Sequence, residues 1–396
     1  MKGKRICFLA CYDIPLGASL RTWNLSKGLT NLGNEVFFIT SNYNHLMPEK
    51  VKLSNVFYRK EKIDGVTVIW INSISYGQSN LLRFIHMALY SLSAFFVTLI
   101  EIRKIDFFIG TSVPLPVALV AYFLSILKKS KFVFEIRDVW PQELIDLGYI
   151  SKNGIIAKIL RKIEVFVAIN ADHIVSALPN VDNHLKEIDE NLTFQYVPNP
   201  YDESLNCKPY DGGEQDKLKV LFIGGTGLAQ DLETIIESFL VCQDTDIELT
   251  FVGPKKRVDS YLEGRNLNFD PKINTYETVK RDQIAKYINS ADLLIHSVKD
   301  TGQLKFGLNS NKLLDYLSSD RPILLASEIE SSIISVSGCG YDIEPENIPL
   351  MASYFKKICK MTPDSRISLG LGGSEFIKEF SVEKISQKVQ NVLTRI

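Results

Sequence analysis

The sequence has few of the residues that hold metals or form disulfides. It contains six cysteines in 396 residues, and none belongs to a C-x-x-C pair. Its five histidines are scattered and form no H-x-x-x-H pair. Thiols spaced in this way are not a disulfide framework, and such histidines do not form a helical metal motif. We therefore expect no bound metal and no other cofactor.

The sequence also lacks an excess of charge of either sign. Its net charge is −1, whereas nucleic-acid-binding domains are usually strongly basic, so we expect no nucleic-acid partner. A hydrophobic fraction of 45%, with 23 Gly and 15 Pro, excludes disordered, collagen-like and coiled-coil chains. At roughly 150 residues per domain, the length predicts two or three domains. The total hides an asymmetry, because residues 1–198 carry +5 and residues 199–396 carry −6.

The N-terminus lacks the long apolar run of a secretory signal. Its basic start is followed only by ICFLACY, and that run ends at Asp13. A run this short is more typical of a first buried strand than of a signal peptide. We expect the protein to remain in the cytoplasm.

Short apolar runs alternate with amphipathic stretches in the first half of the chain. Strands are predicted at 4–11, 35–40, 66–71, 106–111, 131–136 and 173–177. Helices are predicted near 19–32, 80–103, 114–129 and 155–170. Continuously apolar strands that alternate with helices indicate a parallel sheet covered on both faces.

The same alternation begins again after a segment rich in Pro, Gly, Asn and Asp, residues 196–217, which is typical of a hinge. Strands are predicted at 218–224, 247–252, 292–297 and 321–325, and helices near 230–241, 281–289, 309–319, 346–360 and 382–394. The predicted fold is α/β, with two doubly wound domains in tandem. Ligands of such sheets bind beyond the carboxyl ends of the strands, so two facing domains would form a binding cleft.

Residues 81–100, LLRFIHMALYSLSAFFVTLI, have three possible roles. As a helix they would extend about 30 Å, the thickness of the hydrocarbon core of a bilayer. Arg83 and His86 interrupt the stretch, and it lies between two predicted strands of one sheet, which favours a helix of the domain over a membrane span. The third possibility is that one apolar face touches an anionic membrane surface, because basic residues are frequent in the same half. These residues are Arg59, Lys60, Lys62, Arg83, Arg103, Lys104, Lys128, Lys129 and Lys131.

The turn after the first predicted strand lacks the dinucleotide fingerprint. The strand is followed by DIPLGAS, which contains Gly17 and Ser19, and then by a helix that contains Arg21. A dinucleotide-binding domain has G-x-G-x-x-G at this place, and the sequence does not.

A second glycine-rich turn opens the other half. Gly225, Thr226 and Gly227 lie between a predicted strand and a helix that is expected to begin near Gln230. A turn this small lets backbone amides approach an anion at the positive end of a helix. The alternative is a tight turn that only requires a positive φ.

The segment KFGLNSNKLLDYLSSDRP, residues 305–322, combines helix-capping residues with a lysine. Asn309, Ser310 and Asn311 favour a helix start, and Lys312 would then lie in the first turn. A cation is unfavourable at that end of the helix dipole, which suggests a bound anion. Asp315 follows about one turn later and could accept ribose hydroxyls. The alternative is a capped surface helix in which Lys312 and Asp315 form an i,i+3 pair.

The segment FEIRDVWPQELIDLG, residues 134–148, places three charges at the end of a predicted buried strand: Glu135, Arg137 and Asp138. This end of the strand lies on the side where doubly wound sheets carry their chemistry. Charges clustered at a place where burial is costly suggest a functional site. The alternative is an ion pair that closes the strand, with Trp140 in the core.

Taken together, these segments resemble glycosyltransferase family 4, whose members are retaining enzymes of the GT-B fold. The resemblance covers essentially the whole chain and is closest to the bacterial O-antigen and capsule branch, which transfers N-acetylated amino sugars or fucosamines. Its most specific motifs are FVFEIRDVWPQELIDLG, VPNPYD, LFIGGTGLAQDLETIIESF, ADLLIHS and NSNKLLDYLSSDRPIL. It implies two Rossmann-like domains, an acceptor-binding one at 1–198 and a donor-binding one at 199–379. The final helix, within 380–396, would cross back to the first domain.

The resemblance also implies a role for individual residues. Gly225 and Gly227 would meet the donor pyrophosphate, Asp315 would bind ribose as the second acid of the family's E-x7-E motif, and backbone around Tyr276 would meet the base. The implied donor-binding set is Asn199, Gly225, Thr226, Gly227, Tyr276, Asn309, Ser310, Asn311, Lys312 and Asp315. The implied acceptor-binding set is Gly17, Ser19 and Arg21.

The donor site departs from the family pattern in two ways. Gly307 stands where the first acid of E-x7-E is expected, and that acid normally contacts the donor sugar. The usual Arg and Lys of the phosphate site fall at Gly225 and Gln230. We expect Lys312 to replace them.

The catalytic side departs as well. The histidine that is common at the strand end before the acceptor pocket aligns with Arg137. A general base, if one is used, would then be Asp138 or Glu135.

The resemblance implies metal-independent transfer of a sugar, expected to be a UDP-linked N-acetylamino sugar, to a polyprenyl-diphosphate-linked glycan in surface polysaccharide synthesis. The enzyme would be peripheral on the inner face of the cytoplasmic membrane and would contact it through the N-terminal domain. Two alternatives stay open from the residues: a nucleotide-sugar epimerase of the same fold, and a non-catalytic nucleotide-sugar-binding partner at the membrane.

Overall fold

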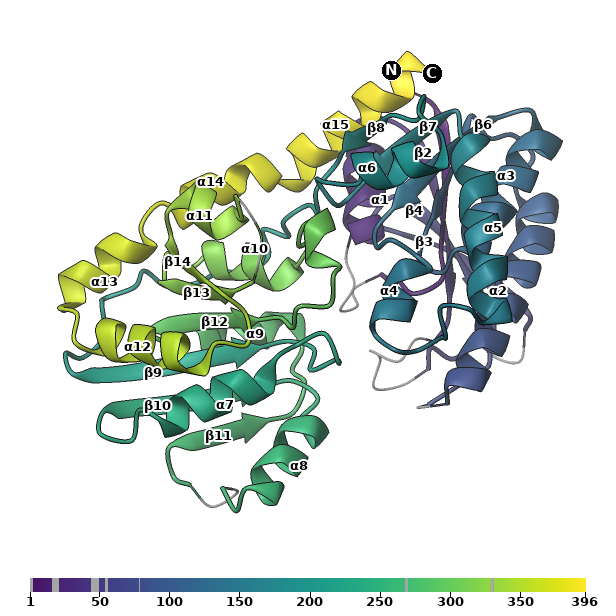
Figure 1. The fold of residues 1–396 in the computed structure, drawn as a ribbon. Helices are drawn as coiled ribbons and strands as arrows, with labels where there is room; N and C mark the ends of the chain where they lie inside the picture. The colour runs from purple at the N-terminus through teal and green to yellow at the C-terminus, as the bar shows by residue number, and fades with distance from the viewer. Residues whose placement is uncertain are drawn as a thin grey trace. The chain divides into compact units, whose positions relative to one another are not determined.

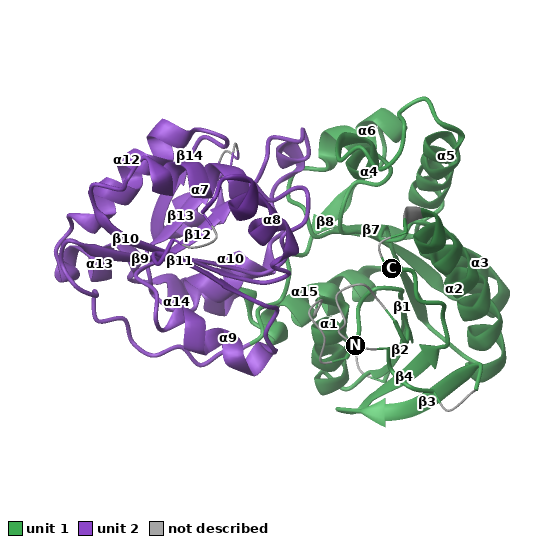
Figure 2. Ribbon diagram, turned by 90° about the horizontal axis from the view of Figure 1, so that it is seen from below, with its two compact units in different colours: residues 1–202, 380–396 green, residues 203–379 purple. Residues whose placement is uncertain are grey.

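The computed structural model describes residues 3–15, 21–43, 50–53, 56–77, 79–267, 270–327, 329 and 331–396. The chain divides into two compact units (Figure 1, Figure 2). Unit 1 comprises Met1–Asp202 and Phe380–Ile396, and unit 2 comprises Glu203–Glu379. The division after Asp202 lies within the segment 196–217 that the composition marks as a hinge.

Unit 1 contains an eight-stranded sheet in the part of the chain that the structure describes, with the order β3-β4-β2-β1-β5-β6-β7-β8. Its strands are β1 (Arg5–Ala10), β2 (Glu35–Ser41), β3 (Tyr58–Ile63), β4 (Val66–Ile71), β5 (Phe107–Thr111), β6 (Lys131–Ile136), β7 (His173–Ser176) and β8 (Phe194–Tyr196). All neighbours pair in parallel except β3 and β4, which are antiparallel. The inner strands are apolar and buried because helices cover both faces of the sheet.

The helices of unit 1 lie on the two faces of this sheet (Figure 1). They are α1 (Arg21–Asn31), α2 (Asn80–Glu101), α3 (Pro116–Lys128), α4 (Gln142–Asp146), α5 (Ile155–Ile169), α6 (Asp182–Ile188) and α15 (Val382–Arg395). One face packs against α1 and α15, whose side chains share a core cluster with Ile6, Phe8 and Ala10 of β1. On the other face, α2 packs beside α3, and α3 packs beside α5.

The C-terminal helix α15 is part of unit 1 although its sequence follows unit 2. Its Ile385, Val389 and Leu393 are buried in the same core cluster as β1. Asn34 Nδ2 donates a hydrogen bond of 2.9 Å to Gln390 Oε1 of this helix. The C-terminal segment Phe380–Ile396 therefore belongs to unit 1.

Unit 2 contains a six-stranded parallel sheet in its described part, with the order β11-β10-β9-β12-β13-β14. Its strands are β9 (Lys217–Ile223), β10 (Asp246–Val252), β11 (Ile273–Tyr276), β12 (Leu293–Ser297), β13 (Ile323–Ala326) and β14 (Gly340–Ile343). Its helices are α7 (Leu232–Leu240), α8 (Lys256–Gly264), α9 (Arg281–Ile288), α10 (Asn311–Leu317), α11 (Ile333–Ser337), α12 (Ile348–Cys359), α13 (Pro363–Gly370) and α14 (Gly373–Phe376), with 3-10 turns at Leu304–Phe306 and Ile377–Phe380.

Both sheets confirm the predicted α/β class, and the predicted inner strands lie within about a residue or two of the observed ones, which is the usual spread at element ends. The sequence analysis missed the edge strands β3, β8, β11 and β14. The reason is clearest for β3, YRKEKI, which is paired on one side only and carries charged side chains. Charges of this kind protect an exposed edge from pairing with other chains, and they also erase the apolar pattern of a buried strand.

Candidate active site

The glycine-rich turn of unit 2 follows β9 at the carboxyl edge of the sheet. Gly224 has a φ of +133°, and a Cβ there would lie 2.5 Å from Lys312 Cε. Beside Gly225 and Gly227, by contrast, a Cβ would meet no atom within 4 Å. Thr226 Oγ1 donates a 2.7 Å hydrogen bond to the carbonyl of Pro254, which ties the turn to the loop after β10. The turn therefore needs glycine at 224 to admit the lysine, and it leaves open space at 225 and 227.

Lys312, in the first turn of α10, places its ammonium against this glycine turn. Its Nζ lies 3.2 Å from the carbonyl oxygen of Gly225 and 2.6 Å from Gln230 Oε1. It also lies 4.3 Å from the centre of the Phe222 ring. Both hydrogen-bond acceptors are neutral, and no carboxylate among the described residues lies within ion-pair distance of this ammonium. Burial lowers the pKa of Lys312 to about 7, because the charged ammonium is less stable when it is removed from water. A bound anion would stabilise the charged form again.

Helix α7, which follows the glycine turn, begins at Leu232 rather than near Gln230. Asp231 caps it, and the carboxylate accepts a 3.2 Å hydrogen bond from the Thr234 amide. The predicted use of this helix start as an anion site is therefore partly blocked, because one amide of the first turn is already taken by a negative group.

Asp315 faces α9 rather than Lys312. Its two carboxylate oxygens accept hydrogen bonds of 2.6 and 2.7 Å from the two terminal nitrogens of Arg281. The alternative of an i,i+3 pair between Lys312 and Asp315 is therefore wrong, since the lysine turns to the glycine turn. A carboxylate oxygen can accept more than one hydrogen bond, so the ribose-binding role of Asp315 stays a prediction.

The remaining predicted donor residues lie on the same unit, with one exception. Ser310 is the N-cap of α10 but makes no side-chain capping bond, and Asn309 and Asn311 flank it half-buried. Tyr276 ends β11, is 44% exposed and packs against Tyr287 with ring centres 5.3 Å apart. Asn199 belongs to unit 1, where its Oδ1 accepts a 3.1 Å hydrogen bond from Arg21.

The carboxyl edge of the sheet in unit 1 carries buried ion pairs. Arg21 Nε lies 3.1 Å from Glu135 Oε1, and both side chains are at most 2% exposed. Arg137 Nη1 lies 2.8 Å from Asp13 Oδ2, and Asp13 also accepts a 3.0 Å hydrogen bond from the Thr22 amide. These pairs join α1, the loop after β1 and the end of β6. Two cations and two carboxylates are thus brought together from places more than 100 residues apart.

The two candidates for a general base have different surroundings. Glu135 is 2% exposed and holds Arg21, which favours a positioning role. Asp138 is half-buried, and burial raises its pKa against the opposing effect of Arg137. Asp138 is therefore the more accessible of the two carboxylates and the better placed to exchange a proton. Of the predicted acceptor-binding residues, Gly17 and Ser19 lie outside the described residues.

Known proteins provide an independent comparison. No family model matches the sequence. A probable glycosyltransferase of Pseudomonas aeruginosa, WbjE, is 22% identical over 285 residues, which are 67% of this chain and 69% of that protein. The sucrose-phosphate synthase of Thermosynechococcus elongatus superposes with a TM-score of 0.76 at 12% identity, covering 99% of this chain and 98% of the synthase. Anabaena HepE in complex with UDP and glucose superposes with a TM-score of 0.69 at 12% identity, covering 99% and 100%.

The chain has the GT-B fold. This result confirms the predicted fold class and the coarser part of the predicted resemblance, namely similarity to glycosyltransferases of GT-B type. In GT-B terms, the glycine turn and Lys312 belong to the second Rossmann-like unit, and the buried ion pairs belong to the first.

Sequence reasoning missed two residues at these edges of the GT-B chain. Glu143 accepts a 2.9 Å hydrogen bond from Trp140 Nε1, and burial together with the charge of Asp138 raises the pKa of Glu143 to about 8. His296 at the end of β12 is buried, and burial and Lys312 hold its pKa well below the ordinary value. Neither ring nitrogen of His296 has a hydrogen-bond partner among the described residues. The sequence places Glu143 three residues after Trp140, which is the only signal that could have pointed to it.

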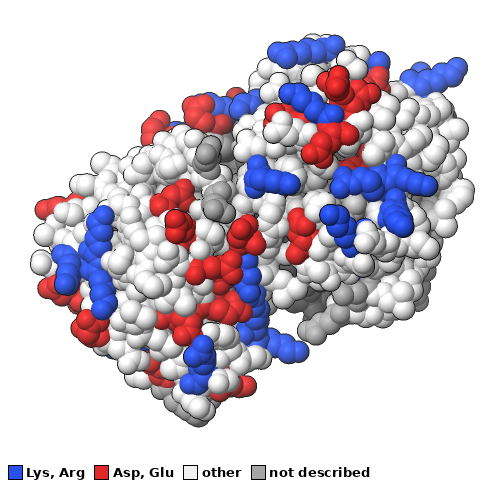
Figure 3. Space-filling model, in the orientation of Figure 1, with Lys and Arg blue, Asp and Glu red and all other residues white. Residues whose placement is uncertain are grey.

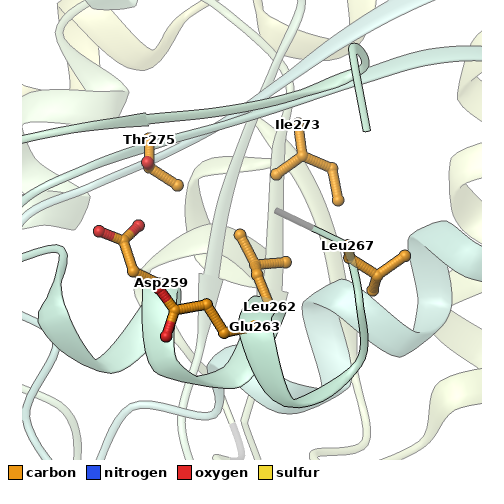
Figure 4. A pocket seen from close by; sticks show the side chains of 6 residues that line it. All are labelled: Asp259, Leu262, Glu263, Leu267, Ile273 and Thr275. Carbon is orange, nitrogen blue, oxygen red and sulfur yellow. The ribbon is translucent and has the colours of Figure 1, made fainter. Parts of the chain in front are cut away.

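A separate pocket of unit 2 lies between α8 and β11 (Figure 4). Its lining residues are Asp259, Leu262, Glu263, Leu267, Ile273 and Thr275. None of the predicted site residues lines it, and Asp259 and Glu263 would repel a nucleotide diphosphate. This pocket is therefore poorly suited to a nucleotide diphosphate.

Proposed function

We propose that this protein is a glycosyltransferase that moves a sugar from a UDP-linked donor, with retention of anomeric configuration, to a polyprenyl-diphosphate-linked glycan. The proposed donor sugar is an N-acetylamino sugar, and the proposed setting is surface polysaccharide synthesis on the inner face of the cytoplasmic membrane. The similarity to WbjE and the GT-B fold support the reaction class. The acceptor, the stereochemistry and the setting rest on the family resemblance.

The observation that carries the proposal is the position of Lys312. Its ammonium lies on an open glycine turn, has neutral partners and is partly desolvated. When the sugar leaves, negative charge develops on the UDP diphosphate. A preorganised cation at that point stabilises the leaving group, which is often the largest contribution to catalysis. We propose that Lys312 supplies this charge, so that the reaction proceeds without a metal ion.

On the acceptor side, Asp138 is the proposed proton acceptor. The pair Arg137–Asp13 lies next to it in sequence and structure and fixes the end of β6. The pair Arg21–Glu135 would hold the same edge rigid, with Asn199 as a further partner of Arg21. A rigid edge keeps the acceptor hydroxyl close to its base, which is a large part of the rate advantage of an enzyme.

One experiment separates this proposal from its alternatives. The protein is incubated with a panel of UDP- and GDP-sugars, with and without a membrane lipid extract, and products are identified by mass spectrometry. Transfer requires the lipid and yields a glycosylated lipid, whereas an epimerase converts the sugar nucleotide without any acceptor. Binding without a product in either condition would identify a non-catalytic partner and overturn the proposal. Retention is tested by the anomeric configuration of the product in NMR.

A further inference from the structure

The outer surface of three helices of unit 1 is unusually apolar for a protein surface. Of the 23 large apolar side chains that are exposed in the described chain, seven lie on α2, three on α3 and five on α5. Scattered apolar residues are normal on a surface, but a contiguous patch marks a contact with another molecule or with a membrane.

The clearest part of this patch is a stripe along α2. It consists of Leu81, Ile85, Leu89, Leu92, Phe96 and Ile100, which are between 40% and 72% exposed. Their spacing of three and four residues puts them on one face of the helix. The opposite face is also apolar and is buried against the sheet, where the Tyr90 hydroxyl donates a 2.7 Å hydrogen bond to the Ile39 carbonyl. Since α2 already uses one apolar face for the core, its second apolar face has no role within the described part of the unit.

The patch continues over α3, which lies beside α2, and over α5, which lies beside α3 (Figure 1). The ammonium of Lys128 at the end of α3 donates a 2.8 Å hydrogen bond to the Leu99 carbonyl of α2. The exposed Phe123 of α3 stacks on Phe166 of α5 with ring centres 6.3 Å apart. On α5, Ile155 and Ile159 extend the apolar surface and are 75% and 54% exposed. The three helices therefore present one continuous outer surface, which we call the α2–α3–α5 face.

The charges of this face that lack an ion-pair partner among the described residues are of one sign. Exposed cations without an ion-pair partner among the described residues stand on α5 and after α2 and α3: Arg103, Lys104, Lys129, Lys158 and Lys162. The three helices contain two acids, Glu101 and Glu164, and both are paired, Glu101 with Lys60 and Glu164 with His184 and Arg161. In Figure 3, the side of unit 1 that carries these helices is mainly uncharged, with basic side chains among the white atoms.

We propose that the α2–α3–α5 face binds the surface of an anionic lipid bilayer. Apolar side chains would enter the boundary between head groups and acyl chains, and the lysines and arginines would meet the phosphates of the lipids. A second copy of the chain fits this face less well, because a symmetric pair would bring the same cations toward each other.

The buried side of α2 determines whether this helix could span the bilayer or lie along its surface. Of the described helices, α2 alone is long and apolar enough to span a bilayer. Spanning would remove Met87, Tyr90 and Ala94 from the core of the unit, where they are at most 4% exposed. The helix therefore lies along the membrane surface. The inference deepens the proposed function, on which it rests for its setting, because a lipid-linked acceptor is held in the same bilayer.

The test is flotation of the purified full chain with vesicles. One set contains phosphatidylcholine alone, and the other contains equal parts of phosphatidylcholine and phosphatidylglycerol. We expect binding to the anionic vesicles, and we expect Leu92→Glu/Phe96→Glu to reduce the bound fraction by about tenfold or more. Lys158→Glu/Lys162→Glu should reduce it by a similar factor, and about 1 M NaCl should mimic that loss because the Debye length falls to about 3 Å.

The matched control is Val336→Glu/Leu371→Glu in unit 2, where both side chains are more than 60% exposed. This variant should float like the unchanged protein. Flotation of the Leu92→Glu/Phe96→Glu variant at the unchanged level would overturn the proposal. So would equal binding to neutral vesicles, resistance to extraction by alkaline carbonate, or a dimer in light scattering that the variant abolishes.

The outcome is independent of the proposed chemistry, because flotation needs neither donor nor acceptor. Transfer to a short-chain, water-soluble acceptor should be unchanged in the face variants. If that transfer is absent in all proteins while flotation behaves as expected, the proposed function fails and the membrane face stands.

Discussion

The two units have sheets of the same kind, but their carboxyl edges treat charge in opposite ways. In unit 1, Arg21 and Arg137 are matched by Glu135 and Asp13, and the four groups are largely removed from water. In unit 2, Lys312 meets a carbonyl and an amide oxygen at the glycine turn. The first edge balances its own charge, and the second has a positive charge that its described neighbours do not balance.

The two arrangements would contribute to a reaction in different ways. A buried pair is weak evidence for stability, because desolvation offsets the attraction, but breaking it leaves one charge buried alone. Such pairs therefore hold a site in one geometry. A desolvated cation with neutral partners raises the free energy of the empty site. An anion that binds next to it stabilises the cation and so lowers that free energy. We infer that unit 1 is built to position and unit 2 is built to bind charge.

Breaking the pair in unit 1 should have the largest effect. Arg21→Met leaves Glu135 buried without its cation, and we expect it to lower the free energy of unfolding of unit 1 by about 3–5 kcal/mol. The measurement is urea unfolding followed by tryptophan fluorescence, which reports on unit 1 because Trp23, Trp70 and Trp140 all lie there.

The matched control for this prediction is an exposed pair in the same unit. Lys131 lies 2.7 Å from Asp172, with side chains 49% and 30% exposed. Lys131→Met should cost no more than about 1 kcal/mol, since surface pairs contribute little. Equal losses in the two variants would show that the buried edge has no special role.

The cation of unit 2 should matter for turnover and not for folding. Lys312→Met keeps most of the aliphatic stem but removes the charge, and we expect kcat for the UDP-sugar to fall by about 10²–10³, as for the loss of one oxyanion donor. The melting temperature should not fall, because a desolvated charge is removed. Lys299→Met is the control, since Lys299 lies at 3.6 Å from Glu233 and should leave kcat unchanged. An unaltered kcat in Lys312→Met would exclude the phosphate role.

The same lysine predicts a dependence on pH. Its pKa is lowered from the ordinary 10.5 to about 7, so the empty protein loses this charge above neutral pH. The unfolded chain then holds more protons than the folded one between about pH 7 and 10.5, and this group makes stability rise with pH across that window. A UDP-sugar needs the charged form, so its affinity should fall by up to about tenfold per pH unit above 7.

Calorimetry checks this dependence directly. At about pH 8, donor binding should take up a proton, which appears as a difference in heat between buffers of different ionisation enthalpy. In Lys312→Arg the charge persists at every pH, and the uptake should vanish. Proton uptake that persists in Lys312→Arg would assign the titration to another group.

The parts of this picture that could be predicted from sequence are those with a local signal. Strands such as β5 and β13 are almost continuously apolar because both faces of their sheets are covered, and that pattern is visible in the residues themselves. The unusual position of Lys312 at the start of a helix predicted a bound anion, and the family resemblance implied that this lysine belongs to the same site as the glycine turn. The turn and the lysine lie more than 80 residues apart, so the contact itself came from the structure.

The parts that could not be predicted depend on tertiary contacts. The partners of Arg21 and Arg137 lie 114 and 124 residues away, and no spacing in the sequence marks them as pairs. The raised pKa of Glu143 arises first from burial, which the sequence does not show. The pairing of Asp315 with Arg281 could not be predicted for the same reason, since Arg281 stands on another helix.

The contact between Asp315 and Arg281 supports the prediction with the smallest expected effect, which separates a nucleotide-binding role of Asp315 from a structural one. Asp315→Asn weakens the pair with Arg281 while keeping the shape of the side chain. If Asp315 also accepts ribose hydroxyls, UDP affinity should fall by about tenfold, the worth of a hydrogen bond to a charged group. Arg281→Met removes the other half of the pair. If Asp315 itself binds the nucleotide, this variant should keep most of the UDP affinity. Titration calorimetry with UDP on both variants distinguishes the two roles. Equal losses of UDP affinity would mean that the pair only holds α9 against α10. A loss confined to Asp315→Asn would assign the carboxylate to nucleotide binding.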